Sequence, residues 1–137
     1  MSRLFTTGPV ENGVGNPALT ALVKVLNNRT TDTLTARIAL YNLEGVKEQI
    51  STVTLTVPAL SSDFTTSQVD FLKEYEIQIE VDKDEGALIS VWALDSEANL
   101  IAAQRFVHTE LKEYPIPAAK IRRFRMPTKK NRKRSRR

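Results

Sequence analysis

The chain has 137 residues, of which 41% are hydrophobic and 26% charged, with a formal net charge of +4. This length and apolar content fit one domain with terminal appendages, and no apolar run approaches the roughly 18 residues needed to span a bilayer. The absence of cysteine excludes disulfides and thiolate metal sites, and a single histidine excludes most histidine-rich metal sites.

Residues 1–17 form the first segment and contain three of the five glycines and two of the six prolines. This composition predicts an extended, flexible arm. No stretch typical of a signal peptide begins the chain, so we expect synthesis in the cytoplasm. Leu4, Phe5 and Val10 are apolar residues on this tether, which suits adding a strand to a neighbour's sheet. A simply disordered arm is the alternative.

Residues 18–113 consist of short runs rich in threonine, valine and isoleucine, separated by polar turns. Apolar and polar residues alternate strictly over 52–57 and 75–82, which is the period of a half-buried strand. The expected strands lie at about 19–27, 33–42, 52–57, 62–70, 75–82, 87–94 and 99–109. Seven strands at this spacing predict an all-β protein, an antiparallel two-sheet β-sandwich of jelly-roll or immunoglobulin-like type.

The strands expected at 87–94 and 99–109 are apolar on both faces. Trp92, Leu94 and Phe106 fall on the face opposite to the one expected to line the core. A sandwich buries only the inner face of each sheet, so the chain's own arms or another subunit would have to cover this outer face. Alternatively, the strands bulge and the assumed register is wrong by one residue. Both interpretations stay open at the level of sequence.

No motif in the sequence indicates catalysis. His108 is the only imidazole, and no nucleophile or carboxylate pattern accompanies it, so we interpret it as a strand-end residue and the protein as non-enzymatic. Asp82, Asp84 and Glu85 leave a calcium site open, but carboxylates spread along a strand favour a solvated polar face. We expect no cofactor and no small-molecule substrate. A module that presents a loop to a small ligand would need a pocket.

The segment 114–137 holds eleven lysines and arginines and no acidic residue. The preceding body has nine basic and sixteen acidic residues, so a body of net charge −7 carries a tail of +11. The last ten residues lack apolar side chains, which predicts disorder until a polyanion neutralises them. The partner would be nucleic acid, a cell-surface polymer or the acidic body of a neighbouring copy. The candidate polyanion-binding residues are Lys120, Arg122, Arg123, Arg125, Lys129, Lys130, Arg132, Lys133, Arg134, Arg136 and Arg137.

Four stretches carry a resemblance to known proteins: FTTGPVENG at 5–13, VPALSS at 57–62, YEIQI at 75–79 and NLIAAQRFVHTEL at 99–111. Together they resemble small β-sandwich proteins of spore-forming Bacillales, of which the spore-surface and endospore-appendage subunits are the nearest characterised group. The resemblance spans about residues 5–111 and implies a sandwich whose N-terminal connector joins its neighbour. The chain departs from that pattern by lacking a cysteine-rich connector and by carrying a polybasic tail.

These observations predict a non-enzymatic, self-assembling structural subunit that forms a homo-oligomer or fibre. The resemblance places it on a spore surface layer or appendage. The expected self-assembly contacts are Leu4, Phe5 and Val10 in the arm, and Trp92, Leu94 and Phe106 on the sheet. The alternative is a nucleic-acid-associated packaging or virion-type structural protein, whose basic tail would bind phosphates.

Overall fold

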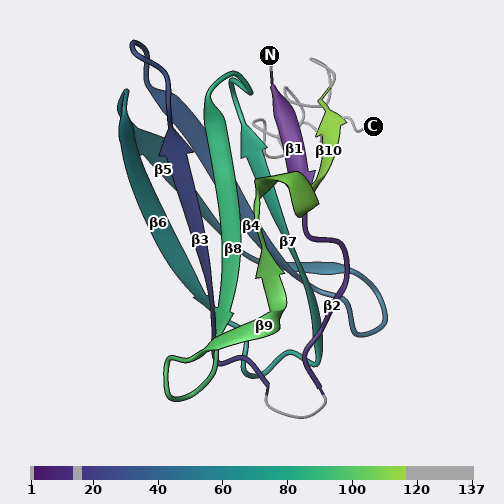
Figure 1. Cartoon of the computed structure of the whole chain (residues 1–137). Helices are drawn as coiled ribbons and strands as arrows, with labels where there is room; N and C mark the ends of the chain where they lie inside the picture. Colours follow the sequence, from purple (N-terminus) through teal and green to yellow (C-terminus); the bar gives the residue numbers. More distant parts are fainter. Residues whose placement is uncertain (1, 14–16, 117–137) are drawn as a thin grey trace, which may run out of the picture.

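A computed structural model describes residues 2–13 and 17–116, which form a sandwich of two antiparallel sheets (Figure 1). The strands are β1 (Arg3–Thr6), β2 (Val10–Glu11), β3 (Thr20–Asn27), β4 (Leu34–Asn42), β5 (Glu48–Val57), β6 (Ser61–Gln68), β7 (Glu74–Val81), β8 (Ala87–Leu94), β9 (Leu100–Phe106) and β10 (Lys112–Pro115). A short 3-10 helix, His108–Glu110, joins β9 to β10. The predicted β-sandwich is therefore confirmed, with ten strands rather than seven.

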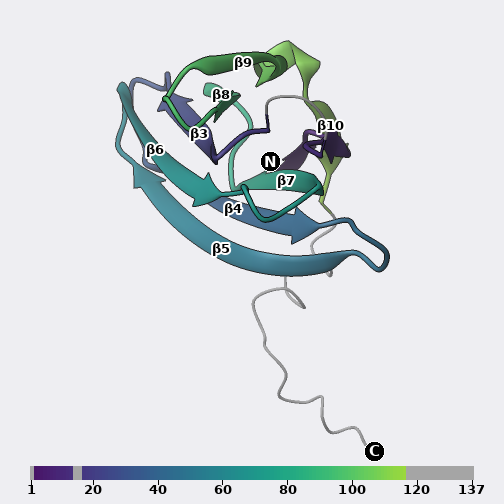
Figure 2. The same cartoon turned by 90° about the horizontal axis from the view of Figure 1, so that it is seen from below.

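The two sheets form the two layers seen end-on in Figure 2. Sheet A has six strands in the order β10-β1-β7-β4-β5, and β2 also pairs with β7. Sheet B has four strands in the order β6-β3-β8-β9. The chain passes from sheet A to sheet B at the turn between β5 and β6, where these two edge strands lie close together. The three unexpected strands, β1, β2 and β10, all belong to sheet A.

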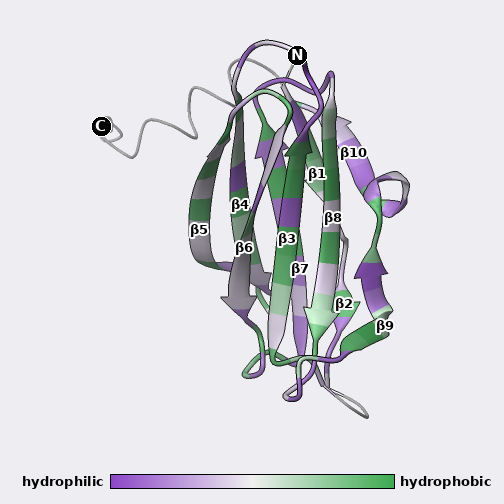
Figure 3. Cartoon of the chain, turned by 60° about the vertical axis from the view of Figure 1, so that its left-hand side comes forward, coloured by the Kyte–Doolittle hydropathy of each residue, from purple (hydrophilic) through white to green (hydrophobic). Residues whose placement is uncertain are grey.

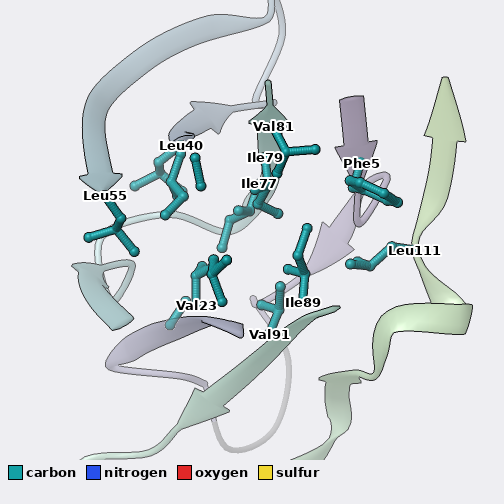
Figure 4. Packing of buried hydrophobic residues seen from close by; sticks show 14 of the residues in the cluster. Phe5, Val23, Leu40, Leu55, Ile77, Ile79, Val81, Ile89, Val91 and Leu111 are labelled. Atoms are coloured by element: carbon teal, nitrogen blue, oxygen red, sulfur yellow. The ribbon is translucent and has the colours of Figure 1, made fainter. Parts of the chain in front are cut away.

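The hydrophobic core lies between the sheets and follows from the alternation along each strand. Val23 of β3 projects from sheet B, and Ile77 and Ile79 of β7 project from sheet A (Figure 4); Val25, two residues after Val23, belongs to the same core. All four side chains are buried, because successive residues of a strand point to opposite faces. Burying each such side chain contributes about 1.5–3 kcal/mol. Phe5 and Leu111 close one side of this core.

The N-terminal segment belongs to the sandwich, contrary to the flexible arm expected over 1–17. β1 lies between β7 and β10, and β2 continues the pairing further along β7. The irregularity at Gly8 and Pro9 is only a local break in this edge. Across it, the Thr7 N–H donates to the Ile77 carbonyl, and the Ile77 N–H donates to the Thr7 hydroxyl, each at 3.1 Å. The side-chain oxygen of Thr7 therefore replaces a backbone hydrogen bond that the bent segment does not form with β7.

Asn12 fixes the end of this N-terminal segment. Its side chain is 2% exposed, and its amide nitrogen donates to the carbonyls of Val69 and Leu72, each at 3.1 Å. Its carbonyl oxygen accepts from the Ala18 N–H at 2.7 Å and from Gln104 at 3.0 Å. One buried amide therefore connects the N-terminal segment, the β6–β7 loop and β9. Such a satisfied network specifies a single arrangement of these loops.

The C-terminal boundary of the sandwich also differs from the expected one. β10 pairs with β1, with Leu4 opposite Tyr114 and Arg3 opposite Pro115. The expected start of the tail at 114 therefore lies inside a strand. The residues predicted to bind polyanions, Lys120 to Arg137, lie outside the described part of the chain.

Candidate assembly surface

The outer face of sheet B carries large apolar side chains on all four strands, interspersed with polar residues such as Lys24, Thr66 and Ser90. Cross-strand partners share a face, so the register places Leu22 beside Trp92 and Leu26 beside Leu88. It also places Leu94 beside Leu100 at one end. Phe64, Leu88 and Leu100 are exposed, and the other members are half-buried. We call the set the apolar face: Leu22, Leu26, Phe64, Leu88, Trp92, Leu94 and Leu100.

The apolar face arises because β3 and β8 are apolar on both sides, as the hydropathy along these strands shows (Figure 3). In β8, Ile89 and Val91 are buried inward while Leu88 and Trp92 point outward. The charged residues in the register of this face are Lys24 and Arg105, both cationic, and no carboxylate stands among its paired residues. Large apolar side chains gathered on the outer face of a sheet make this face a candidate interaction surface.

Trp92 is held in a defined orientation on this face. Its indole N–H donates to the Ser90 hydroxyl at 2.8 Å, and the Arg105 guanidinium lies 5.8 Å from the ring centre. The polar end of the indole is therefore satisfied within the chain. The apolar ring remains available for packing against a partner.

The question of register that the sequence left open has a different answer in each of the two strands. In β8 the assumed register is correct, so Trp92 and Leu94 do lie on the outer face. In β9 the register shifts, because Arg105 pairs with Trp92 whereas Leu100 pairs with Leu94. Phe106 therefore lies opposite Val91 and packs against the core. Its expected place on the outer face is wrong: Arg105 faces outward opposite Trp92, and Leu100 faces outward opposite Leu94.

The arm residues expected to contact a neighbour lie elsewhere. Phe5 and Val10 are 2% and 4% exposed within the chain's own core, because β1 and β2 are strands of sheet A. Leu4 points outward from sheet A and lines a groove of about 430 Å³ together with Tyr41 and Tyr114. The described N-terminal strands therefore leave the apolar face of sheet B uncovered.

Glu76 is a buried carboxylate on the outer side of sheet A. It forms an ion pair with Lys47 at 2.7 Å and accepts hydrogen bonds from Thr6 and Gln78. Burial opposes ionisation, but the hydrogen bonds from Lys47, Thr6 and Gln78 outweigh it and lower the pKa of Glu76. This cluster ties β1 to the β4–β5 hairpin. Every charge in it has a partner, which indicates a structural role.

His108 also has a structural environment. Its Nδ1 accepts the Ile89 N–H at 3.1 Å, and its ring centre lies 4.9 Å from that of Phe5. The imidazole thus accepts a hydrogen bond from a β8 backbone N–H that lies beyond the last residue pair between β8 and β9. The acidic residues near 82–85 are likewise engaged: Asp84 contacts Arg3 at 3.1 Å, and Glu85 contacts Arg29 at 3.6 Å. Over residues 2–13 and 17–116, no group of acidic residues and histidine could hold a metal ion.

Sequence reasoning did not single out Leu22, Leu26 and Phe64. The signal for the two leucines was present, because Leu22 and Leu26 alternate with Val23 and Val25 just as the two sides of β8 do. Phe64 sits in a polar strand, and only its register opposite Lys24 assigns it to the apolar face.

The chain matches no protein-family model and no curated protein. Among solved structures, it is similar to the Anabaena sensory rhodopsin transducer, with 17% identity, a TM-score of 0.46 and coverage of 69% of this chain and 90% of that one. It is also similar to Thermotoga maritima 1070, with 12% identity, a TM-score of 0.47 and coverage of 82% and 90%. Within the described ranges, no helix has the length and apolar character needed to cross a membrane.

Proposed function

We propose that this protein is a non-enzymatic structural subunit that assembles with further copies of itself through the apolar face of sheet B. The observation that carries the proposal is the apolar face itself: seven large apolar side chains lie on one side of a four-stranded sheet, and none of the described strands packs over them. Exposing such a surface to water is unfavourable at about 25 cal/mol per Å². A second copy would remove it from water.

The size of the apolar face supports this occupant. Strands about 4.8 Å apart with a rise of about 3.3 Å per residue give the outer side of sheet B, with three strands of eight residues and one of seven, a footprint of about 500 Å². Two copies packed face to face would bury about 1,000 Å², which reaches the lower limit of a specific protein interface. Further contacts outside the sheet would add to this area.

The charge of the tail indicates a contact separate from the apolar face. The tail carries +11, and the body of a neighbouring copy carries −7. The basic tail is therefore suited to a polyanion or to that acidic body. The spore surface or appendage as the setting rests on the sequence resemblance.

The +11 tail also supports a second candidate, a packaging or virion-type protein whose tail binds nucleic acid while the sandwiches assemble. Under this candidate, purified protein freed of nucleic acid would stay monomeric and would assemble when nucleic acid is added back. Under the first candidate, assembly needs protein alone.

The test compares the full-length protein with a Leu88→Glu, Leu100→Glu double variant after nuclease and high-salt treatment. We expect oligomers or fibres from the unchanged protein, and association weakened by about 100-fold or more in the variant, because an unpaired buried charge costs at least about 3 kcal/mol. Light scattering and negative-stain microscopy provide the readout.

The matched control is Phe71→Glu, which alters an apolar side chain in the β6–β7 loop that is 59% exposed and lies off the apolar face. This control should assemble normally, and all variants should keep their circular dichroism. A protein that stays monomeric without nucleic acid, or a double variant that still assembles beyond dimers as the unchanged protein does, would contradict the proposal.

A further inference from the structure

The edge of sheet A formed by β5 is open and unprotected. Of the described strands, only β4 pairs with β5, so one side of β5 presents free backbone donors and acceptors. Its residues from Ser51 to Thr54 are all exposed, and Val53, on the core side, is 36% exposed. Natural proteins usually blunt such edges with charges, proline, bulges or irregular pairing.

The strands at the other three sheet ends carry such devices. The edge strand β6 contains Asp63, β9 contains Arg105 and a register break, and β10 contains Lys112, Glu113 and Pro115. In β5, by contrast, residues 51–57 read STVTLTV, with no charge, glycine or proline. This segment is rich in β-branched residues, a composition that favours strand pairing.

The regular part of β5 has clear limits. At its start the register with β4 shifts, because Leu40 pairs with Ser51 while Tyr41 pairs with Gln49, leaving Ile50 as the extra residue of a bulge. At its end Pro58 follows Val57 and has no N–H to donate. The segment available for regular pairing is therefore 51–57, and Thr54 is its midpoint.

We propose that β5 of one copy pairs antiparallel with β5 of a second copy about a two-fold axis at Thr54. With the axis perpendicular to the sheet, the core sides of the two copies lie on the same side of the joined sheet. Opposed residues must then point to the same side, so one residue of β5 must lie opposite the same residue of the second copy. Choosing Thr54 pairs all seven residues. Thr52 then faces Thr56 on the outer side, and Val53 faces Leu55 on the core side. Threonine and aliphatic pairs of this kind stabilise sheets, and no like charges meet.

This inference rests on the proposed self-assembly and gives it a second contact surface. The β5 edge belongs to sheet A and the apolar face to sheet B, so one copy could use both at once. Edge pairing alone produces a closed dimer. Combined with packing through the apolar face about a different axis, it produces an open chain of subunits.

Cysteine cross-linking of the full-length protein tests the pairing, since the chain has no cysteine of its own. Opposed residues of an antiparallel pair have Cα atoms about 4.5–5.5 Å apart, within disulfide range. Under mild oxidation, Thr54→Cys should form covalent dimers about tenfold faster than Thr52→Cys, whose two copies would lie roughly 14 Å apart along the strands. The double variant Thr52→Cys, Thr56→Cys should again cross-link, because these positions face each other.

Equal rates for Thr54→Cys and Thr52→Cys would overturn the pairing. Repeating the experiment with Leu88→Glu and Leu100→Glu separates the two proposals. If only the proposed packing through the apolar face is wrong, Thr54→Cys still cross-links while the unchanged protein forms no assembly beyond dimers. If only the proposed β5 pairing is wrong, assembly still depends on Leu88 and Leu100, while Thr54→Cys cross-links no faster than Thr52→Cys.

Discussion

Glu76 shows how one residue can make the stability of the sandwich depend on pH. Its carboxylate is 7% exposed and is held ionised by Lys47, Thr6 and Gln78. Because these contacts lower its pKa in the folded state, the unfolded chain binds the proton more readily. The stabilisation from this group is therefore present above the ordinary glutamate pKa of about 4.3, and it is lost as pH falls through the lower folded value.

Glu76→Gln should reduce the loss of stability at acid pH. We expect the free energy of unfolding of the variant to fall less between neutral pH and about pH 3 than that of the unchanged protein, because the amide does not titrate in this range. Urea unfolding at each pH gives the measurement. Glu97→Gln, in the exposed turn before β9, is the control, and its stability should fall at acid pH as that of the unchanged protein does. Parallel curves for the Glu76 variant and the unchanged protein would contradict the assignment.

At the scale of elements, β1 is a structural strand rather than a docking arm. Phe5 projects from it into the core and contacts His108, whereas Leu4 points outward. Phe5→Ala should therefore destabilise the fold by about 3–5 kcal/mol, and Leu4→Ala by much less. Denaturant unfolding measures both. A docking arm would give the opposite result, with assembly abolished in the Phe5 variant and stability unchanged.

The same elements show what could be predicted from sequence. Strict alternation in β7 and at the end of β5 reveals which side chains are buried, because the period of a strand is visible in a single segment. The place of β1 depends on partners far along the chain, which local composition does not record, and Gly8 with Pro9 suggested an irregular arm. In the candidate site, Trp92 and Leu94 were correctly placed. Phe106 was misplaced because a bulge in β9 leaves no local signal.

At the scale of the whole molecule, charge is divided between the sandwich and the tail. The described ranges contain all sixteen acidic residues and nine basic ones, and the remaining eleven basic residues follow Ile116. A neighbouring body at −7 and a polyanion are both electrostatically suited to the tail. The division also means that the overall charge of +4 describes neither part.

Removal of residues 118–137 should leave cooperative unfolding unchanged, because the last described strand ends at Pro115. It should abolish retention of a single-stranded DNA oligonucleotide. Removing only 129–137, with seven of the eleven cations, should reduce the slope of log affinity against log salt by about 0.7 for each phosphate that the shortened tail no longer neutralises. Loss of cooperative unfolding in the chain without 118–137 would instead assign Ile121, Phe124 or Met126 to the core.

The position of β1 between β7 and β10 determines when the subunit can be completed during synthesis. Of the described strands, the first pairs with the last, since Arg3 of β1 lies opposite Pro115 of β10 as well as Val81 of β7. Contacts between residues so distant in the chain form slowly, because closing the loop costs entropy before pairing repays it. β1 can therefore complete both of its pairings only after Lys112–Pro115 has been synthesised. Until that point one side of β1 has no paired strand, and the sandwich is unfinished along this edge of sheet A.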